Sequence, residues 1–153
     1  MLGDKPATTQ AAIEGVAQRE IKTFPDERGF FREMARLDNE FYGEGLTRLG
    51  HTTILAETVK AWFVQPEQAS WWYVPAGKLK VALYDARDGS TTYGNLMEFA
   101  LGDGQPGLVI RIPAGVAGGG KALEGTAQLI IGCENSQGER FISQQELGLD
   151  YEF

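Results

Sequence analysis

The chain of 153 residues has a single cysteine, a single histidine and no long apolar run. Because Cys133 stands alone, an internal disulfide is excluded, and such sparing use of cysteine is typical of a reducing compartment. No segment approaches the roughly 20 apolar residues that a membrane helix needs. The N-terminus also lacks the basic and apolar regions of a signal peptide. We therefore expect a cytoplasmic protein with no membrane partner.

Basic residues are also few, because 14 Lys and Arg stand against 21 Asp and Glu and leave a net charge of −7. Proteins that bind nucleic acids carry a basic patch or stripe, so we expect no nucleic acid partner. The lone histidine excludes the clustered imidazole ligands of an iron or zinc centre. The sequence therefore predicts no metal site and no cofactor.

What the chain does have is a succession of short β-like runs separated by Gly, Pro and Asp. Residues 78–85, KLKVALYD, place Leu79, Val81 and Leu83 on one face, which is the pattern of a half-buried strand. Many short strands at regular spacing predict an all-β sandwich, barrel or jelly roll. We expect strands at 16–22, 30–35, 50–56, 59–65, 70–75, 78–86, 94–101, 108–112, 127–133 and 139–143.

The rest of the organisation is simple. Short peripheral helical turns are expected only at residues 36–43 and 144–148. Residues 1–12 are small and polar, which favours a flexible N-terminal tail. The chain is long enough for one domain with a real core and too short for two, so residues 13–153 are expected to form a single domain.

Three stretches resemble motifs of the dTDP-4-dehydrorhamnose 3,5-epimerases. Residues 24–33, FPDERGFFRE, are similar to their D-x-R-G-x-F-x-E signature. Residues 77–94, which begin GKLKVALYDAR, resemble their G-x-v-x-D-v-x-v-D-x-R-x-g-S-p-T-y-G hairpin, and residues 112–117, IPAGVA, resemble I-P-x-G-F-A. Order and spacing agree from about Ile13 to Tyr151. The resemblance implies a double-stranded β-helix (cupin) barrel.

In that family the first motif grips the nucleotide, with Arg on the diphosphate and the aromatic ring on the thymine. The resemblance thus implies ligand-binding roles for Arg28, Phe31 and Glu33, with a dTDP-sugar as the ligand. The chemistry fits, because guanidinium binds phosphate through two parallel hydrogen bonds. The family is dimeric, and this motif reaches into the partner's pocket, which implies a homodimer. The same residues could instead form a charged hairpin whose Phe30 or Phe31 belongs to the core.

The residues that carry out the family's chemistry are missing. The family removes a proton from the carbon beside a ketone with a His base, which an Asp supports, and a Tyr acts as the acid. The base falls at Phe63, and phenylalanine has no titratable group. The other replacements are Gly118 for a second His, Ser70 for a Lys that faces the ketone, residues 133–135 without the Tyr, and Gln144 or Gln145 for the Asp. We therefore do not expect the usual epimerase mechanism.

Several polar groups remain where the resemblance puts the pocket. Lys60 replaces a phosphate-binding Arg, which keeps the charge but loses the two-pronged contact. Gln65 and Asp85 match a Gln and an Asp of the family. Asp85 could act as a base if burial raised its pKa, or it could be a structural carboxylate that closes the turn at residues 85–88.

One predicted strand carries three consecutive aromatic residues. Alternation sends Ser70 and Trp72 to one side and Trp71 and Tyr73 to the other. If Ser70 faces the pocket, so does Trp72, beside Phe63. Aromatic walls suit a sugar ring or a flat apolar ligand, but they could equally plug the barrel. Outward-facing Trp71 and Tyr73 would be candidates for a dimer interface.

Three further features were considered as sites. His51, the only histidine, is either a relocated base or a surface residue. Residues 118–121, GGGK, lack the spacing of a P-loop, so we expect a flexible rim loop. Cys133 has no histidine nearby in the sequence to activate it, and we expect a packed thiol.

These observations leave three functions open. The first is a protein that binds a nucleotide-sugar or another small ligand without the usual 3,5-epimerase chemistry. The second is a divergent carbohydrate epimerase or isomerase that acts on a dTDP-4-keto-6-deoxyhexose or related ligand, with Asp85, Tyr73, Glu134 or His51 as a rebuilt acid or base. The third is a non-catalytic scaffold with a plugged aromatic core.

Overall fold

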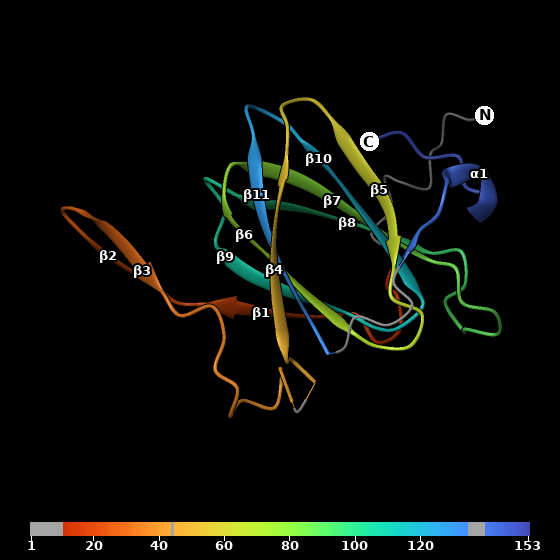
Figure 1. The fold of residues 1–153 in the computed structure, drawn as a ribbon, viewed down its shortest axis with the longest axis horizontal. Helices are drawn as coiled ribbons and strands as arrows, with labels where there is room; N and C mark the ends of the chain where they lie inside the picture. The colour runs from red at the N-terminus through yellow and green to blue at the C-terminus, as the bar shows by residue number, and fades with distance from the viewer. Residues whose placement is uncertain (1–10, 44, 135–139) are drawn as a thin grey trace.

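The computed structural model describes residues 11–43, 45–134 and 140–153. Two five-stranded antiparallel sheets face each other, and a separate hairpin projects from them (Figure 1). The first sheet has the order β1 (Ala17–Ile21), β9 (Gly107–Ile112), β6 (Ser70–Ala76), β11 (Ala127–Cys133) and β4 (Arg48–Ile54). The second has the order β12 (Arg140–Phe141), β5 (Val59–Val64), β10 (Val116–Ala122), β7 (Lys78–Asp85) and β8 (Leu96–Gly102). The hairpin is β2 (Thr23–Asp26) and β3 (Gly29–Arg32). The predicted all-β cupin barrel is confirmed.

Strand β7 shows how the sequence builds the core. Leu79, Val81 and Leu83 alternate along it and are fully buried at 0% exposure, as period-two patterning predicts. Its other face is covered as well, because Tyr84 lies in a second apolar cluster closed by residues 142–153. The prediction of a half-buried strand was therefore wrong. A segment distant in sequence covers the face that local alternation leaves open.

The glycine run at residues 118–120 forms the middle of strand β10, between β5 and β7. The prediction of a flexible rim loop was wrong. Neighbouring groups fill the space that side chains would need: an added Cβ would lie 2.5 Å from the Cβ of Ala61 at Gly119, and 3.0 Å from Cδ1 of Leu79 at Gly120. Glycine weakens an isolated strand, but it permits this close approach of neighbours.

In residues 11–43, 45–134 and 140–153, helical structure is limited to one short element. Helix α1 (Gln144–Leu147) begins with a capping box in which the Ser143 hydroxyl accepts from the Glu146 N–H, and it ends at Gly148 with φ of 65°. Residues 36–43 form successive turns and no helix. No helix in the described part of the chain is long and apolar enough to span a membrane.

Trp71 and Tyr73 lie on the outer face of β6, as alternation predicts, but they are not available to a dimer partner. They are only 2% and 8% exposed, because side chains from residues 34–35, 41–42 and 46 pack with them. The Trp71 indole also donates a hydrogen bond to the carbonyl oxygen of Phe41 at 3.0 Å. The interface predicted from these two residues was therefore wrong.

Part of the predicted organisation falls outside the described residues. This applies to residues 1–10 of the predicted tail (1–12) and to Glu139 in the strand predicted at 139–143. Ile13, the expected first residue of the domain, is 3% exposed and joins the main core cluster. A single domain over residues 13–153 stays a prediction.

Candidate functional site

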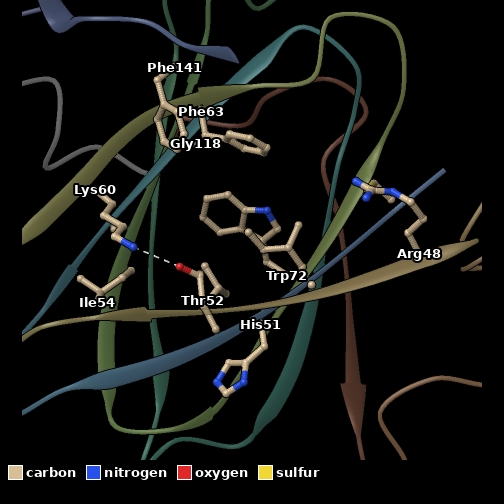
Figure 2. A pocket seen from close by; sticks show the side chains of 14 residues that line it. Arg48, His51, Thr52, Ile54, Lys60, Phe63, Trp72, Gly118 and Phe141 are labelled. Carbon is tan, nitrogen blue, oxygen red and sulfur yellow. Dashed lines mark hydrogen bonds between the residues drawn. The ribbon is translucent and has the colours of Figure 1, made fainter. Parts of the chain in front are cut away.

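A cavity of about 280 Å³ lies between the inner faces of the two sheets. Side chains from β4, β6 and β11 of the first sheet line it, together with residues of β5, β10 and β12 of the second (Figure 2). Ligand pockets usually start at roughly 300 Å³, so the volume suits one ring-sized group. The pocket is thus large enough to hold part of a ligand and too small to hold a nucleotide-sugar whole.

The walls of this pocket are aromatic and aliphatic. Trp72 reaches in from β6 and Phe63 from β5, beside Phe141, with 5.3 Å between the Phe63 and Phe141 ring centroids. Trp72 lies over Gly118, where an added Cβ would come within 2.9 Å of the indole Cη2. The rings line the cavity without filling it. The plugged core considered from the sequence was therefore wrong.

Two cationic side chains face the pocket from its two sides (Figure 2). Lys60 Nζ donates to Thr52 Oγ1 at 3.1 Å, and Arg48 Nη2 donates to the Cys133 sulfur at 3.2 Å. The described lining residues include no Asp or Glu. In a chain with a net charge of −7, this pocket is locally positive, which favours an anionic ligand.

Of the residues expected to bind the ligand, the structure brings Lys60, Phe63 and Trp72 together in the pocket. Gln65 follows β5 and is only 3% exposed; its carbonyl oxygen accepts from the Gly115 N–H at 2.8 Å. Gln65 does not line the pocket. Its backbone hydrogen bond with Gly115 instead holds the end of β5 in place.

The first-motif residues lie on or next to the projecting hairpin, away from the pocket of their own chain (Figure 1). Phe30 and Phe31 are 55% and 62% exposed, so the alternative that they belong to the core was wrong. Arg28 forms an exposed pair with Asp26 at 3.0 Å. Glu33 directly follows the hairpin. Any contact of this hairpin with a pocket must therefore involve a second copy of the chain or a rearrangement.

Asp85 is held in a polar cluster at the end of β7. It is 0% exposed and accepts hydrogen bonds from Arg87 Nε at 2.9 Å, Ser90 Oγ at 2.7 Å and Thr92 Oγ1 at 2.6 Å. Burial by itself raises the pKa of Asp85, but these hydrogen bonds, with Arg87 foremost, outweigh it and hold the pKa well below its usual range. The arrangement supports a structural carboxylate, since a carboxylate so stabilised is a poor base.

The other acid–base candidates also point elsewhere. His51 borders the pocket, but Figure 2 shows its ring directed away from the cavity, and its Nε2 hydrogen-bonds to Gln128. Tyr73, on the outer face of β6, accepts a hydrogen bond from Arg32 at 3.4 Å. Glu134 follows β11 and borders a different hollow. None of the described residues proposed as acid or base thus has its side chain in the pocket.

Arg48, Thr52, Cys133 and Phe141 were missed as pocket residues by the sequence analysis. Residues 48, 50, 52 and 54 share one face of β4 because the side-chain period of a strand is two. This alternation could be recognised in the sequence, and it predicts that His51 lies on the opposite face of β4. Cys133 is 3% exposed, as a packed thiol should be, yet it also borders the pocket. Phe141 had no local signal, because only the pairing of β12 with β5 brings it opposite Phe63.

A metal centre is not evident in this site. The residues that the structure describes contain no cluster of three or more His, Cys, Asp and Glu side chains arranged to hold an ion. The chemistry of the pocket therefore depends on cations, aromatic rings, one hydroxyl and one thiol.

Fold and pocket together define a cupin with a small-molecule site between its two sheets. A family model described as dTDP-4-dehydrorhamnose 3,5-epimerase matches residues 10–152. The chain belongs to this family.

Relatives in the family include proteins of carbohydrate biosynthesis. The spore coat polysaccharide biosynthesis protein SpsL of Bacillus subtilis is 34% identical over 119 residues, 78% of each chain. A Haloferax volcanii protein named "Probable low-salt glycan biosynthesis epimerase Agl13" is 31% identical over 78% of this chain and 76% of that one. The solved dTDP sugar isomerase of Desulfovibrio desulfuricans G20 has a TM-score of 0.83 and 27% identity, covering 92% and 91% of the two chains.

Proposed function

We propose that this protein binds a dTDP-sugar in carbohydrate biosynthesis without the proton abstraction of the 3,5-epimerases. The observation that carries the proposal is the pocket chemistry. The described side chains directed into the cavity supply two cations and three aromatic rings but no carboxylate or phenol, and the imidazole of His51, which borders the pocket, is directed away from it. General base catalysis requires a group of this kind within hydrogen-bond reach of the proton. Phe63 lies in the pocket as an apolar wall.

The polar and apolar parts of the pocket match different parts of such a ligand. Lys60 and Arg48 can contact oxygens that carry negative charge, while Trp72 and Phe63 present flat apolar faces that suit stacking against a sugar ring. Because the cavity is about 280 Å³, the nucleotide must extend beyond it. The exposed hairpin residues Arg28, Phe31 and Glu33 of a second copy would supply its outer contacts, as the family resemblance implies.

Calorimetric titration with dTDP and with a dTDP-sugar tests this function. We expect saturable binding at one site per chain. Lys60→Ala should weaken it by about 10- to 150-fold, because a charged hydrogen bond is typically worth about 1.5–3 kcal/mol. Lys78→Ala is the matched control: Lys78 pairs with Glu124 at 2.8 Å on the surface, and its loss should leave the affinity unchanged. No binding of either ligand at millimolar concentration would exclude a dTDP-sugar.

One observation favours a second function, a divergent sugar isomerase. Cys133 borders the pocket, and its sulfur lies 3.2 Å from Arg48 Nη2. A thiol can exchange a proton with a carbon beside a ketone, which the aromatic walls cannot do. If this function is right, a dTDP-4-keto-6-deoxyhexose should incorporate solvent deuterium, and Cys133→Ala should abolish the incorporation. If hours of incubation produce no exchange, binding without turnover is the remaining function.

A further inference from the structure

Trp72 contains a hydrogen-bond donor that the described part of the chain does not use. Its Nε1 is buried and has no hydrogen-bond partner among the described residues, and the residue is 3% exposed. The other two tryptophans have partners, since Trp62 donates to Gln144 Oε1 at 3.2 Å and Trp71 donates to the Phe41 carbonyl at 3.0 Å. Buried polar groups are nearly always paired. The unpaired indole belongs to the pocket wall, where a ligand could supply the acceptor.

Arg48 offers more donors on the same side of the pocket. Its guanidinium has five N–H groups and no acceptor. The described residues give it one polar contact, the Cys133 sulfur at 3.2 Å, and sulfur is a weak acceptor. Most of the Arg48 donors are therefore available to a ligand.

The sheet register brings these two donors together. Cys133 pairs with both Arg48 on β4 and Ser70 on β6, and Ile131 pairs with Trp72. Trp72 is therefore the diagonal neighbour of Cys133 on the inner face, and diagonal neighbours lie within about 8 Å. Figure 2 shows the guanidinium of Arg48 and the nitrogen edge of the Trp72 indole turned toward one another.

We propose that Arg48 and the Trp72 indole form a subsite for an oxygen that only accepts hydrogen bonds, a ketone or carboxylate oxygen on the enclosed ring of the ligand. Both groups only donate, so a hydroxyl placed there would find no strong acceptor for its own proton. The inference rests on the proposed function, in that the ring belongs to a dTDP-sugar.

Lys60 lies too far along the pocket to share the same oxygen. It donates a hydrogen bond to Thr52. Thr52 is four residues from Arg48 on β4, so the Cα atoms of these two residues lie about 13 Å apart at 3.3 Å per residue. A ligand that spans the pocket can therefore contact Lys60 with its phosphate end and reach the Arg48–Trp72 subsite with its sugar end. With the ligand in this orientation, Trp72 contacts the sugar and helps to distinguish one sugar from another.

Calorimetry with four ligands tests the subsite: dTDP, dTDP-glucose, dTDP-4-keto-6-deoxyglucose and dTDP-glucuronate. We expect the ketone or the carboxylate ligand to bind about tenfold more tightly than dTDP-glucose, a factor that corresponds to about 1.4 kcal/mol. If only the keto sugar or only the glucuronate binds more tightly than dTDP-glucose, the result identifies which oxygen is recognised. Trp72→Phe keeps a ring and removes the donor, so it should remove most of this preference and leave dTDP affinity within about twofold. Lys78→Ala, which alters a surface side chain paired with Glu124 outside the pocket, should change neither quantity.

A second readout does not depend on nucleotide binding. The indole N–H resonance of Trp72, assigned by its disappearance in Trp72→Phe, should move downfield with the keto sugar or the glucuronate and stay in place with dTDP alone. If equal losses for all four ligands follow Trp72→Phe, or if no acceptor ligand moves the resonance, the subsite is refuted. A resonance that moves with free glucuronate, in a protein that does not bind dTDP, would refute the proposed function and retain the subsite.

Discussion

Replacing Asp85 by alanine should lower the free energy of unfolding by about 4 kcal/mol, because it leaves the Arg87 guanidinium in a largely buried site without its carboxylate. Asp85 is 0% exposed and the Arg87 side chain 25% exposed. Removing one partner of a buried ion pair typically costs about 3–5 kcal/mol. For a chain of this length the melting temperature should fall by roughly 8–16 °C. Urea unfolding and a thermal scan measure the two quantities.

The same carboxylate should make the stability depend on pH in a defined direction. The folded pKa of Asp85 lies below its unfolded value, so its contribution is fully present above the unfolded pKa of about 3.9. It is lost as the pH falls from there toward the folded pKa. In Asp85→Asn, the free energy of unfolding should therefore depend less on pH below the unfolded pKa of the aspartate. The affinity for the ligand should stay unchanged.

The hairpin provides a matched control for the Asp85 pair. Asp26 and Arg28 are two residues apart in the sequence, like Asp85 and Arg87, and form an ion pair at 3.0 Å. Their side chains, however, are 44% and 82% exposed. Solvent screens exposed pairs strongly, so Asp26→Ala should leave the free energy of unfolding nearly unchanged. Equal losses from Asp85→Ala and Asp26→Ala would contradict the structural role assigned to the buried pair.

The sequence was sufficient for the barrel and for part of the site. Period-two alternation and the three motifs predicted most of the strands, though not β10, and the direction of Trp72 into the pocket beside Phe63. Asp85 was left between two roles, because its partners Ser90 and Thr92 lie across a turn whose geometry the sequence does not specify. Local signals determine which face a residue takes, but they do not tell what covers that face.

The features that sequence reasoning missed depend on contacts between distant segments. Residues 142–153 cover the outer face of the second sheet, and residues 34–35, 41–42 and 46 cover Trp71 and Tyr73. The run at 118–120 was mistaken for a loop because its neighbours, Ala61, Leu79 and Trp72, come from three other strands. Glycine composition indicates flexibility only where no neighbour fills the space beside it.

The space beside Gly118 is occupied by a residue of another strand. The resemblance places a family histidine at Gly118 of β10, and in this chain Trp72 of β6 lies next to that position. The indole occupies the space beside Gly118, since an added Cβ there would lie 2.9 Å from Cη2 and 3.2 Å from Cζ2 of Trp72. Packed interiors tolerate exchanges of large and small residues when the total volume is kept. The indole of Trp72 thus takes the space that a side chain at position 118 would need, so a larger residue at 118 and the indole at 72 compete for the same volume.

A double-mutant cycle should show this coupling. Gly118→Ala alone should cost about 2 kcal/mol through overpacking, and Trp72→Val alone about 3 kcal/mol through the cavity it creates. The double variant should cost about 1–2 kcal/mol less than the sum, because removing the indole makes room for the new methyl group. Gly120→Ala is the matched control: its added Cβ would lie 3.0–3.2 Å from atoms of Leu79, with no Trp72 atom among its nearest neighbours. Its cost should therefore add to that of Trp72→Val within about 0.5 kcal/mol. Urea unfolding measures all six proteins, and additivity at Gly118 would mean that the two replacements are independent.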